Sequence, residues 1–337
     1  MIIMNILITG AAGFIGSNLS AKLLKDGHKI WAVDNFLTGK PETLDILREN
    51  TNFIFAHCGI ETEDFLKFCS DQEVKFDQIF DLACPTGVPN IEILGEEMLI
   101  ACSDGTRNVL KVAQEHDARF LFSSSSEIYG EPEVPAQRET YTGNVDPIGW
   151  RANYEEGKRF SETLIMHAVR KHKLKASIVR LFNVYGPKMS LEDSRVIPTF
   201  VIQALTGKGL TVHGKGTQIR TMCFVDDLVN GLILVMKKGI AGEAYNLGSD
   251  KAISMLDLAK EIILATESES DVIFTPRAEH DHSSRMPVLD KVRALGWDHK
   301  VDLQAGLKIT IDDFRERMIA YDVKYAVDKN LQLQPQS

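Results

Sequence analysis

The chain has 337 residues, 44% of them hydrophobic, which is enough to bury a large core in one large domain or two closely packed ones. Its formal net charge of -9 argues against a nucleic-acid-binding protein, because such proteins usually present a basic face. Its five scattered cysteines form no C-x-x-C pair, and its apolar start at 2–8 lacks a basic leader and is too short to span a bilayer, so we expect a cytoplasmic chain with reduced thiols and no membrane contact.

Apolar runs alternate with helical segments through the first half of the chain. Such alternation predicts an α/β protein with a Rossmann-type doubly wound parallel sheet, in which helices cover both faces. A later run at 245–249 is expected to return to this sheet as a further strand. The six runs that we expect to form the first strands are 2–8, 29–33, 52–56, 78–83, 119–123 and 176–182.

The rhythm of strand and helix becomes irregular after about residue 183, where Gly and Pro residues cluster. We therefore expect a smaller, mixed α/β C-terminal lobe that binds the substrate. The predicted organisation is a Rossmann domain at 1–182 with a returning segment near 222–248, a discontinuous substrate lobe at 183–320 and a polar C-terminal tail at 321–337.

Three glycines, Gly10, Gly13 and Gly16, follow the first expected strand and open a helix. Glycine there lets the backbone turn tightly and approach a pyrophosphate, which amides at the helix N-terminus then bind. The next expected strand ends in Asp34, 18 residues later, where a carboxylate can accept ribose hydroxyls and would repel a 2′-phosphate. The sequence therefore predicts NAD rather than NADP; a plain glycine turn with Asp34 capping a loop is the alternative. The expected cofactor-binding residues are Gly10, Gly13, Phe14, Ile15, Gly16, Asp34, Asn35, Thr38, Leu82, Ala83, Tyr154 and Lys158.

The stretch SSSSEIYG, at 123–130, has the composition of a flexible linker. It directly follows the apolar run 118–122, which is typical of a buried strand, and it continues into Ile128 and Tyr129 rather than into more polar residues. We therefore interpret it as a strand end that carries hydroxyl groups and one carboxylate.

The segment 153–171 has the pattern of an amphipathic helix and sets Tyr154 and Lys158 four residues apart on one face. A tyrosine that acts as a base near neutral pH needs a pKa about three units below its free value near 10. The Lys158 ammonium and a nicotinamide cation can supply that change. The alternative is a surface helix with a solvated face rich in Glu and Lys.

Four blocks of sequence carry a resemblance to a known family: SSSSEIYGEPEV, DPIGWRANYEEGKR, RLFNVYGPKM and GTQIRTMCFVDDLVNGL. With them the chain resembles the extended short-chain dehydrogenases/reductases, in the NAD-dependent nucleotide-sugar epimerase/dehydratase group. Within that group it is most similar to the UDP-glucuronate decarboxylases, over about residues 4 to 318.

The resemblance implies a cycle that leaves the cofactor unchanged. Tyr154 takes the proton of the sugar 4-hydroxyl as hydride passes to NAD, and Lys158 holds the nicotinamide ribose. Ser125 matches the residue that hydrogen-bonds the 4-oxygen, Glu127 matches the glutamate beside the reacting carbons, and Arg285 matches an arginine proposed to meet the sugar carboxylate. Each of these residues also has an alternative interpretation that does not use the resemblance. Ser125 would cap a strand end, Glu127 would be a solvated turn residue and Arg285 would be a surface arginine.

The same resemblance implies a site for the UDP part of the substrate. Asn183, Arg195 and Arg220 match positions around the diphosphate, and His213 stands where relatives often carry a tyrosine near uracil. Surface salt bridges for the arginines and a plain loop position for His213 are the alternatives. Ser126 is a further candidate for substrate contact. No metal belongs to this chemistry, and we interpret the pair His280 and His282 as solvated loop residues.

Three positions depart from the decarboxylase pattern. Ile91 occupies the place of a tyrosine that lines the sugar pocket, Ala101-Cys102 replaces Thr-Asn, and Cys58 replaces an aspartate expected near the adenine. These substitutions remove polar groups but leave Ser125, Tyr154 and Lys158 intact. They place the exact sugar in question.

Four functions follow in order of preference. The first is decarboxylation of UDP-glucuronate to UDP-xylose, or of another UDP-uronic acid. A UDP-sugar 4-epimerase is second, with Glu127 against it, and a nucleotide-sugar 4,6-dehydratase is third. A non-catalytic NAD-binding sensor or scaffold represents a different class. The resemblance also suggests a homodimer formed through the helix of Tyr154 and a long helix around 92–116, with Phe160 and Leu164 as apolar contacts.

Overall fold

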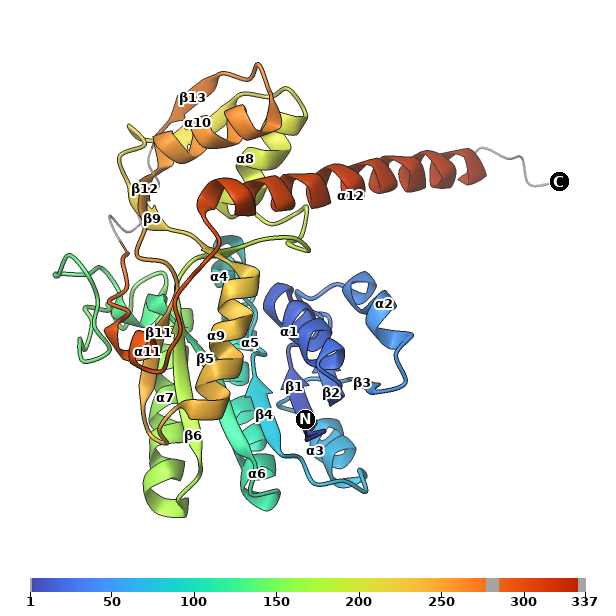
Figure 1. The fold of residues 1–337 in the computed structure, drawn as a ribbon, viewed down its shortest axis with the longest axis vertical. Helices are drawn as coiled ribbons and strands as arrows, with labels where there is room; N and C mark the ends of the chain where they lie inside the picture. Colours follow the sequence, from blue (N-terminus) through green and yellow to red (C-terminus); the bar gives the residue numbers. More distant parts are fainter. Residues whose placement is uncertain (1, 277–284, 333–337) are drawn as a thin grey trace.

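A parallel sheet of seven strands lies at the centre of the larger lobe in the computed structural model, which describes residues 2–276 and 285–332 (Figure 1). The strand order is β11-β6-β5-β4-β1-β2-β3, and every neighbouring pair is parallel. This arrangement confirms the predicted fold class. The strands are β1 (Asn5–Thr9), β2 (Lys29–Asp34), β3 (Phe53–His57), β4 (Gln78–Asp81), β5 (Arg119–Ser125), β6 (Ala176–Leu181) and β11 (Ala244–Leu247).

Helices cover both faces of the sheet, since successive side chains of a strand point to opposite sides. In β1, Ile6 and Ile8 belong to one hydrophobic cluster and Leu7 to the other. The first cluster includes residues of α1 (Phe14–Lys25) and α9 (Val225–Lys238). The second includes residues of α3 (Glu63–Ser70), α6 (Thr106–Glu115) and α7 (Ala152–His172).

The long helix expected around 92–116 is interrupted. It consists of α4 (Val88–Ile93), α5 (Gly95–Ile100), the π-helical segment η2 (Ala101–Gly105) and α6. Single π-helical turns of this kind occur frequently at functional sites. The other short helices beside the large sheet are η1 (Pro41–Leu44), α2 (Asp45–Arg48), η3 (Ser126–Tyr129) and α11 (Asp290–Ala294).

The smaller lobe is built around one hydrophobic cluster that includes Phe200, Leu258 and Leu307. Its helix α12 continues beyond residue 321, where we predicted a tail, and Figure 1 shows it projecting from the body of the lobe. The domain boundaries themselves stay a prediction. The elements here are α8 (Val196–Leu205), α10 (Met255–Thr266), α12 (Leu303–Gln332) and the two-stranded pairs β8 (Leu210–His213) with β13 (Val272–Thr275), β9 (Ile219–Thr221) with β12 (Ala252–Ser254), and β7 (Val184–Tyr185) with β10 (Cys223–Phe224).

The strand order reverses beside β1, because the chain proceeds from β1 toward β3 on one side and toward β11 on the other. In doubly wound sheets the ligand binds at the carboxyl ends of the strands where this reversal occurs. Gly10 and the serine tract follow β1 and end β5, so both lie on this edge. Along the described part of the chain, no helix combines the length and apolarity that crossing a bilayer would need.

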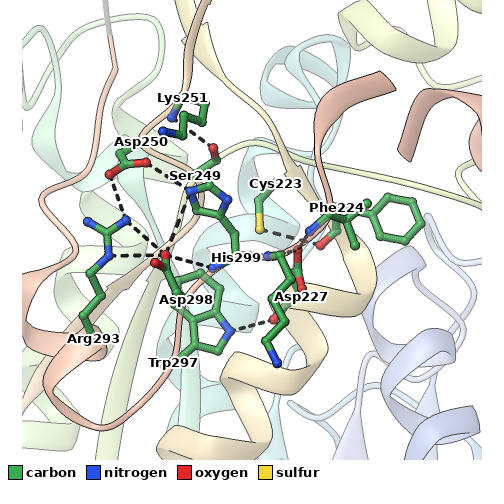
Figure 2. A network of polar contacts seen from close by, with 12 residues as sticks. Cys223, Phe224, Asp227, Ser249, Asp250, Lys251, Arg293, Trp297, Asp298 and His299 are labelled. Carbon is green, nitrogen blue, oxygen red and sulfur yellow. Dashed lines mark hydrogen bonds and ion pairs between the residues drawn. The ribbon is translucent and has the colours of Figure 1, made fainter. Parts of the chain in front are cut away.

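A polar network ties the segment before α12 to the start of α9 (Figure 2). The buried carboxylate of Asp227 accepts hydrogen bonds from the backbone amides of Lys300 and Val301, each at 2.8 Å. The backbone carbonyl of Asp227 accepts the indole N–H of Trp297 at 2.9 Å. Next to it, His299 contacts Asp250 at 3.0 Å. The network fixes the connection by which the chain passes from α11 back to the smaller lobe.

The Asp227→Ala variant should therefore lose about 1–3 kcal/mol of unfolding free energy, since it leaves two part-buried amides without their charged acceptor. The Asp226→Ala variant is the matched control, because Asp226 lies in the same first turn of α9 with an exposed side chain. Urea unfolding of both variants measures the difference. Equal stability of the two variants would remove Asp227 from this structural role.

Candidate active site

A cavity of about 880 Å³ lies at the carboxyl edge of the sheet and is lined by residues of both lobes. Every residue that we predicted for cofactor, catalysis or substrate faces it: Gly10, Gly13, Phe14, Ile15, Gly16, Asp34, Asn35, Thr38, Leu82, Ala83, Ser125, Ser126, Glu127, Tyr154, Lys158, Asn183, Arg195, His213, Arg220 and Arg285. His280 and His282 lie outside the described residues. Within the described ranges, no group of three His, Cys, Asp or Glu side chains is placed to hold a metal ion.

The glycine turn leaves no room for side chains. Gly10 has a φ of 66°, and a Cβ there would lie 2.9 Å from the backbone of Leu82 and Ala83. A Cβ at Gly16 would lie 2.1 Å from the carbonyl oxygen of Gly10. The turn is therefore pressed against the end of β4, and the N-terminus of α1 opens into the cavity next to it.

Asp34 orders this turn as well as facing the cavity. Its carboxylate accepts the amide of Ala12 at 2.9 Å and that of Phe36 at 2.8 Å. Burial raises the pKa of Asp34, and the two amides oppose that change. Asp34 therefore caps the loop, which was the alternative interpretation of this residue. Each of its carboxylate oxygens still has a lone pair that can accept a further hydrogen bond.

A buried pair beneath the turn fixes the end of β4. Thr9 donates to Asp81 at 2.7 Å and its hydroxyl oxygen accepts the amides of Leu82 and Ala83. Burial raises the pKa of Asp81 to about 6, although Thr9 and the Lys158 ammonium oppose this. The pair positions the backbone of Leu82 and Ala83, which line the cavity.

The serine tract is structured throughout. Ser123, Ser124 and Ser125 end β5, and Ser126 begins the 3₁₀ helix η3. The Ser125 hydroxyl accepts the amide of Glu127 at 3.2 Å, so it caps η3 while facing the cavity. The structure thus rules out the linker interpretation, and Ser125 lies close enough to Tyr154 to lower the pKa of its phenol.

Tyr154 and Lys158 lie on the face of α7 that is turned toward the cavity. Lys158 is buried and donates to the carbonyl of Ser123 at 2.9 Å. Burial raises the pKa of Tyr154 to about 12, whereas the Lys158 ammonium and Ser125 lower it. Lysine therefore acts in the expected direction, but burial outweighs it in the protein alone.

Glu127 lies between two arginines. Arg285 pairs with one carboxylate oxygen and Arg151 with the other, and Arg151 also contacts Glu155 at 3.4 Å. The side chains of this row are 5%, 21%, 15% and 5% exposed in the order Arg285, Glu127, Arg151, Glu155. The two positive and two negative charges of the row balance. Because the Arg285 side chain is buried, it is not a surface arginine.

The predicted UDP-binding residues come from the smaller lobe and its connections. Arg195 is paired with Asp193 at 2.9 Å and remains 41% exposed. His213 contacts Thr275 at 3.0 Å, and Asn183 is exposed at the cavity wall. Arg220 also lines the cavity. The smaller lobe and its connections thus contribute polar side chains to the cavity that the glycine turn also lines.

The sequence of residues 6–248 matches the model of the NAD dependent epimerase/dehydratase family. The chain belongs to this family. The match covers the glycine turn, the serine tract, Tyr154 and Lys158, which are the elements that the cavity brings together.

Curated relatives and solved structures show which members of the epimerase/dehydratase family this chain is similar to. The chain is 39% identical to UDP-glucuronic acid decarboxylase 1 of Danio rerio, over 93% of this chain and 73% of that protein. It is also 39% identical to UDP-glucuronic acid decarboxylase 2 of Arabidopsis thaliana, over 94% and 69%. UDP-glucose 4-epimerase of Thermotoga maritima, solved with UDP-glucose, superposes with a TM-score of 0.86 at 29% identity, over 94% of this chain and all of that one.

The three departures from the decarboxylase pattern have different places in this epimerase/dehydratase site. Ile91 and Cys58 line the cavity, and the Ile91 carbonyl accepts the side-chain amide of Asn153 at 2.6 Å. Cys102 is buried beneath the cavity in η2. The sequence analysis missed Arg151 as a partner of Glu127, although it lies three residues before Tyr154 in the quoted block DPIGWRANYEEGKR.

Proposed function

We propose that this protein is an NAD-dependent UDP-glucuronate decarboxylase that forms UDP-xylose. The observation that carries the proposal is the row of Arg285, Glu127 and Arg151 next to Ser125 and Tyr154. A guanidinium group in the sugar part of the cavity suits a substrate carboxylate. The named decarboxylase relatives support the same assignment.

NAD fits the residues at the carboxyl edge of the sheet. The glycine turn has no space for a Cβ at Gly10 or Gly16, so the backbone can approach a pyrophosphate there. Asp34 faces the same part of the cavity and suits ribose hydroxyls rather than a 2′-phosphate. When bound, NAD would accept a hydride from carbon 4 of the sugar and return it at the end of the cycle.

Tyr154 accepts the proton of the sugar 4-hydroxyl in the oxidation step and gives it back in the reduction. Its pKa must fall from about 12, so it depends on Lys158, on Ser125 and on the positive charge of the nicotinamide. Lys158 is held in place by the carbonyl of Ser123. The hydroxyl of Ser125 lies at the sugar 4-oxygen in this proposal.

The 4-keto uronic acid is a β-keto acid. The bond between carbon 5 and the carboxylate breaks, its electron pair moves toward the 4-carbonyl, and carbon dioxide leaves. Arg285 orients the carboxylate before it leaves, and Arg151 keeps Glu127 directed toward the reacting carbons. A proton then returns to carbon 5 before the 4-keto group is reduced. Four further residues that line the cavity hold the UDP group in this proposal: Asn183, Arg195, His213 and Arg220.

Incubation with NAD⁺ and UDP-glucuronate, followed by mass analysis of the products, tests the proposal. Decarboxylation gives a UDP-pentose that has lost carbon dioxide. A UDP-uronate of unchanged mass would instead support a 4-epimerase. That second candidate is favoured by the superposition with UDP-glucose 4-epimerase. Absence of any product with bound NAD⁺ would favour a binding protein without turnover.

Asp34 should decide the choice between the two cofactors. The Asp34→Asn variant keeps an acceptor for the Ala12 amide but removes the charge, so we expect the preference for NAD⁺ over NADP⁺ to fall at least about tenfold. Fluorescence titration with both cofactors measures this ratio. Asp45→Asn, a change of the same charge on the exposed face of α2, should leave it unchanged. An unchanged ratio in Asp34→Asn would refute the role.

The homodimer and the cytoplasmic location belong to the same proposal. Phe160 of α7 is 50% exposed and Leu99 of α5 is 45% exposed, which offers apolar area on two helices in contact with each other. Leu164, in contrast, packs against the core of the large lobe. Sedimentation at micromolar concentration distinguishes a dimer from a monomer.

A further inference from the structure

Two cysteines meet beneath the cavity without a role in the proposed reaction. The sulfur atoms of Cys84 and Cys102 lie 3.8 Å apart, and both residues are free thiols. Cys84 follows β4 and lines the cavity, whereas Cys102 lies in the π-helical segment η2 and is 2% exposed. The pair therefore has one member that a small molecule in the cavity can reach and one that is shielded.

The pair is packed against the catalytic helix α7. The Ser161 hydroxyl donates to the carbonyl of Cys102 at 2.6 Å, and a Cβ at Gly157 would lie 3.3 Å from the Cys102 sulfur. Gly157 and Ser161 flank Lys158 on that helix. A change at the sulfur atoms is therefore one residue away from the lysine that serves Tyr154.

The surroundings of Cys102 favour its thiolate. A hydrogen bond with the Cys84 thiol holds the pKa of Cys102 below its usual value, and the Lys158 ammonium and Ser161 act in the same direction against burial. The other cysteines differ: burial and nearby acidic groups raise the pKa of Cys58 to about 11 and that of Cys69 to about 12. The hydrogen bond with Cys102 and burial also raise the pKa of Cys84, well above its usual value. Thiolate character controls thiol reactivity, so Cys102 carries the thiolate of the pair and can take the proton of the Cys84 thiol 3.8 Å away.

We propose that Cys84 and Cys102 are a modification site, at which a peroxide that enters the cavity forms a reversible disulfide and slows the enzyme. The Cys84 thiol passes its proton to the Cys102 thiolate, and the Cys84 sulfur attacks hydrogen peroxide to become a sulfenic acid, with release of hydroxide. The Cys102 thiol then attacks the Cys84 sulfur, and its proton leaves with the sulfenic hydroxyl group as water. Two thiols are oxidised and one peroxide is reduced by two electrons.

Formation of the disulfide between Cys84 and Cys102 requires a movement that changes the shape of the cavity. A disulfide has a sulfur separation of about 2.05 Å, so the two atoms must approach by nearly 2 Å from their present distance. Cys84 is the neighbour of Ala83, whose amide is positioned by Thr9 beside the glycine turn. Misplacement of a positioning group by about 1 Å can cost about a hundredfold in rate.

The test treats the full-length protein with hydrogen peroxide and maps disulfides by mass spectrometry of peptides without reduction. We expect a cross-linked peptide pair containing Cys84 and Cys102, and its loss on addition of dithiothreitol. Oxidation should lower NAD⁺ affinity or UDP-glucuronate turnover by about tenfold or more, with recovery on reduction. The peptide map and NAD⁺ titration do not depend on the proposed reaction, so a wrong substrate would not affect them.

Three serine variants complete the design, and the measured quantity is the ratio of oxidised to reduced function within each one. Cys84→Ser and Cys102→Ser should each lose the reversible effect. Cys58→Ser removes another cavity thiol and should keep it. Absence of the cross-link, a cross-link without any change in function, or an equal effect in Cys102→Ser overturns the proposal.

Discussion

Replacement of Tyr154 by phenylalanine should lower turnover of UDP-glucuronate by about 10²–10⁴-fold and leave NAD⁺ affinity within about threefold. The variant removes the hydroxyl for which we propose proton exchange with the sugar, while the ring and the neighbouring Lys158 remain. Single-turnover kinetics with mass detection of carbon dioxide loss measure the effect.

Tyr141→Phe is the matched control for this variant. Its hydroxyl accepts the amide of Glu133 at 3.1 Å and does not line the cavity, so turnover should be unchanged. A spectroscopic titration adds a second readout. Because burial holds the pKa of Tyr154 near 12 in the protein alone, the Tyr154 phenol stays protonated below about pH 10, and NAD⁺ binding should lower that pKa. Normal turnover by Tyr154→Phe would show that another group moves the proton.

Glu127→Gln should reduce decarboxylation by about 10²–10⁴-fold without loss of NAD⁺ binding. The substitution keeps the shape of the side chain but removes the charge between Arg151 and Arg285, so both guanidinium groups lose an ionic partner inside the cavity. The rate of carbon dioxide release and the NAD⁺ affinity are measured on the same preparation.

Glu155→Gln separates catalysis from charge balance. Glu155 contacts the same Arg151 but does not line the cavity, so this control removes an equal charge from the far end of the row. We expect its decarboxylation rate to stay within about threefold of the unmodified enzyme, with any loss confined to stability. If both glutamate variants slow the reaction equally, the charge row acts as a structural unit and Glu127 has no separate role.

The large sheet was predictable from local pattern. Its strands are short apolar runs, and the signals Gly10, Asp34 and the serine tract each lie within a few residues of the end of one strand. The smaller lobe was not predictable in detail, because strands such as β7 and β10 have two residues each and pair across a long stretch of sequence. Such short strands have no periodicity of their own.

Some features of the candidate site were likewise predictable from local sequence, whereas others depended on the fold. Residue spacing was sufficient to predict that Tyr154 and Lys158 share one face of a helix, and the structure has both on α7 with side chains at the cavity. The partnership of Arg151 with Glu127 needed the fold, since 24 residues separate them. The pKa of Tyr154 depended on burial by residues that the sequence could not place, so the lysine effect alone gave an incomplete expectation.

The last strand of the large sheet has a consequence for how the chain is made. β11 pairs with β6, and α9 packs on α1, although about 200 residues separate those helices. Until the ribosome has released residues 225–247, β6 remains an open edge and one face of the sheet has no cover from α9. Open edges and bare apolar faces favour aggregation. The nascent first half of the chain therefore needs protection until residues 225–247 have also been synthesised.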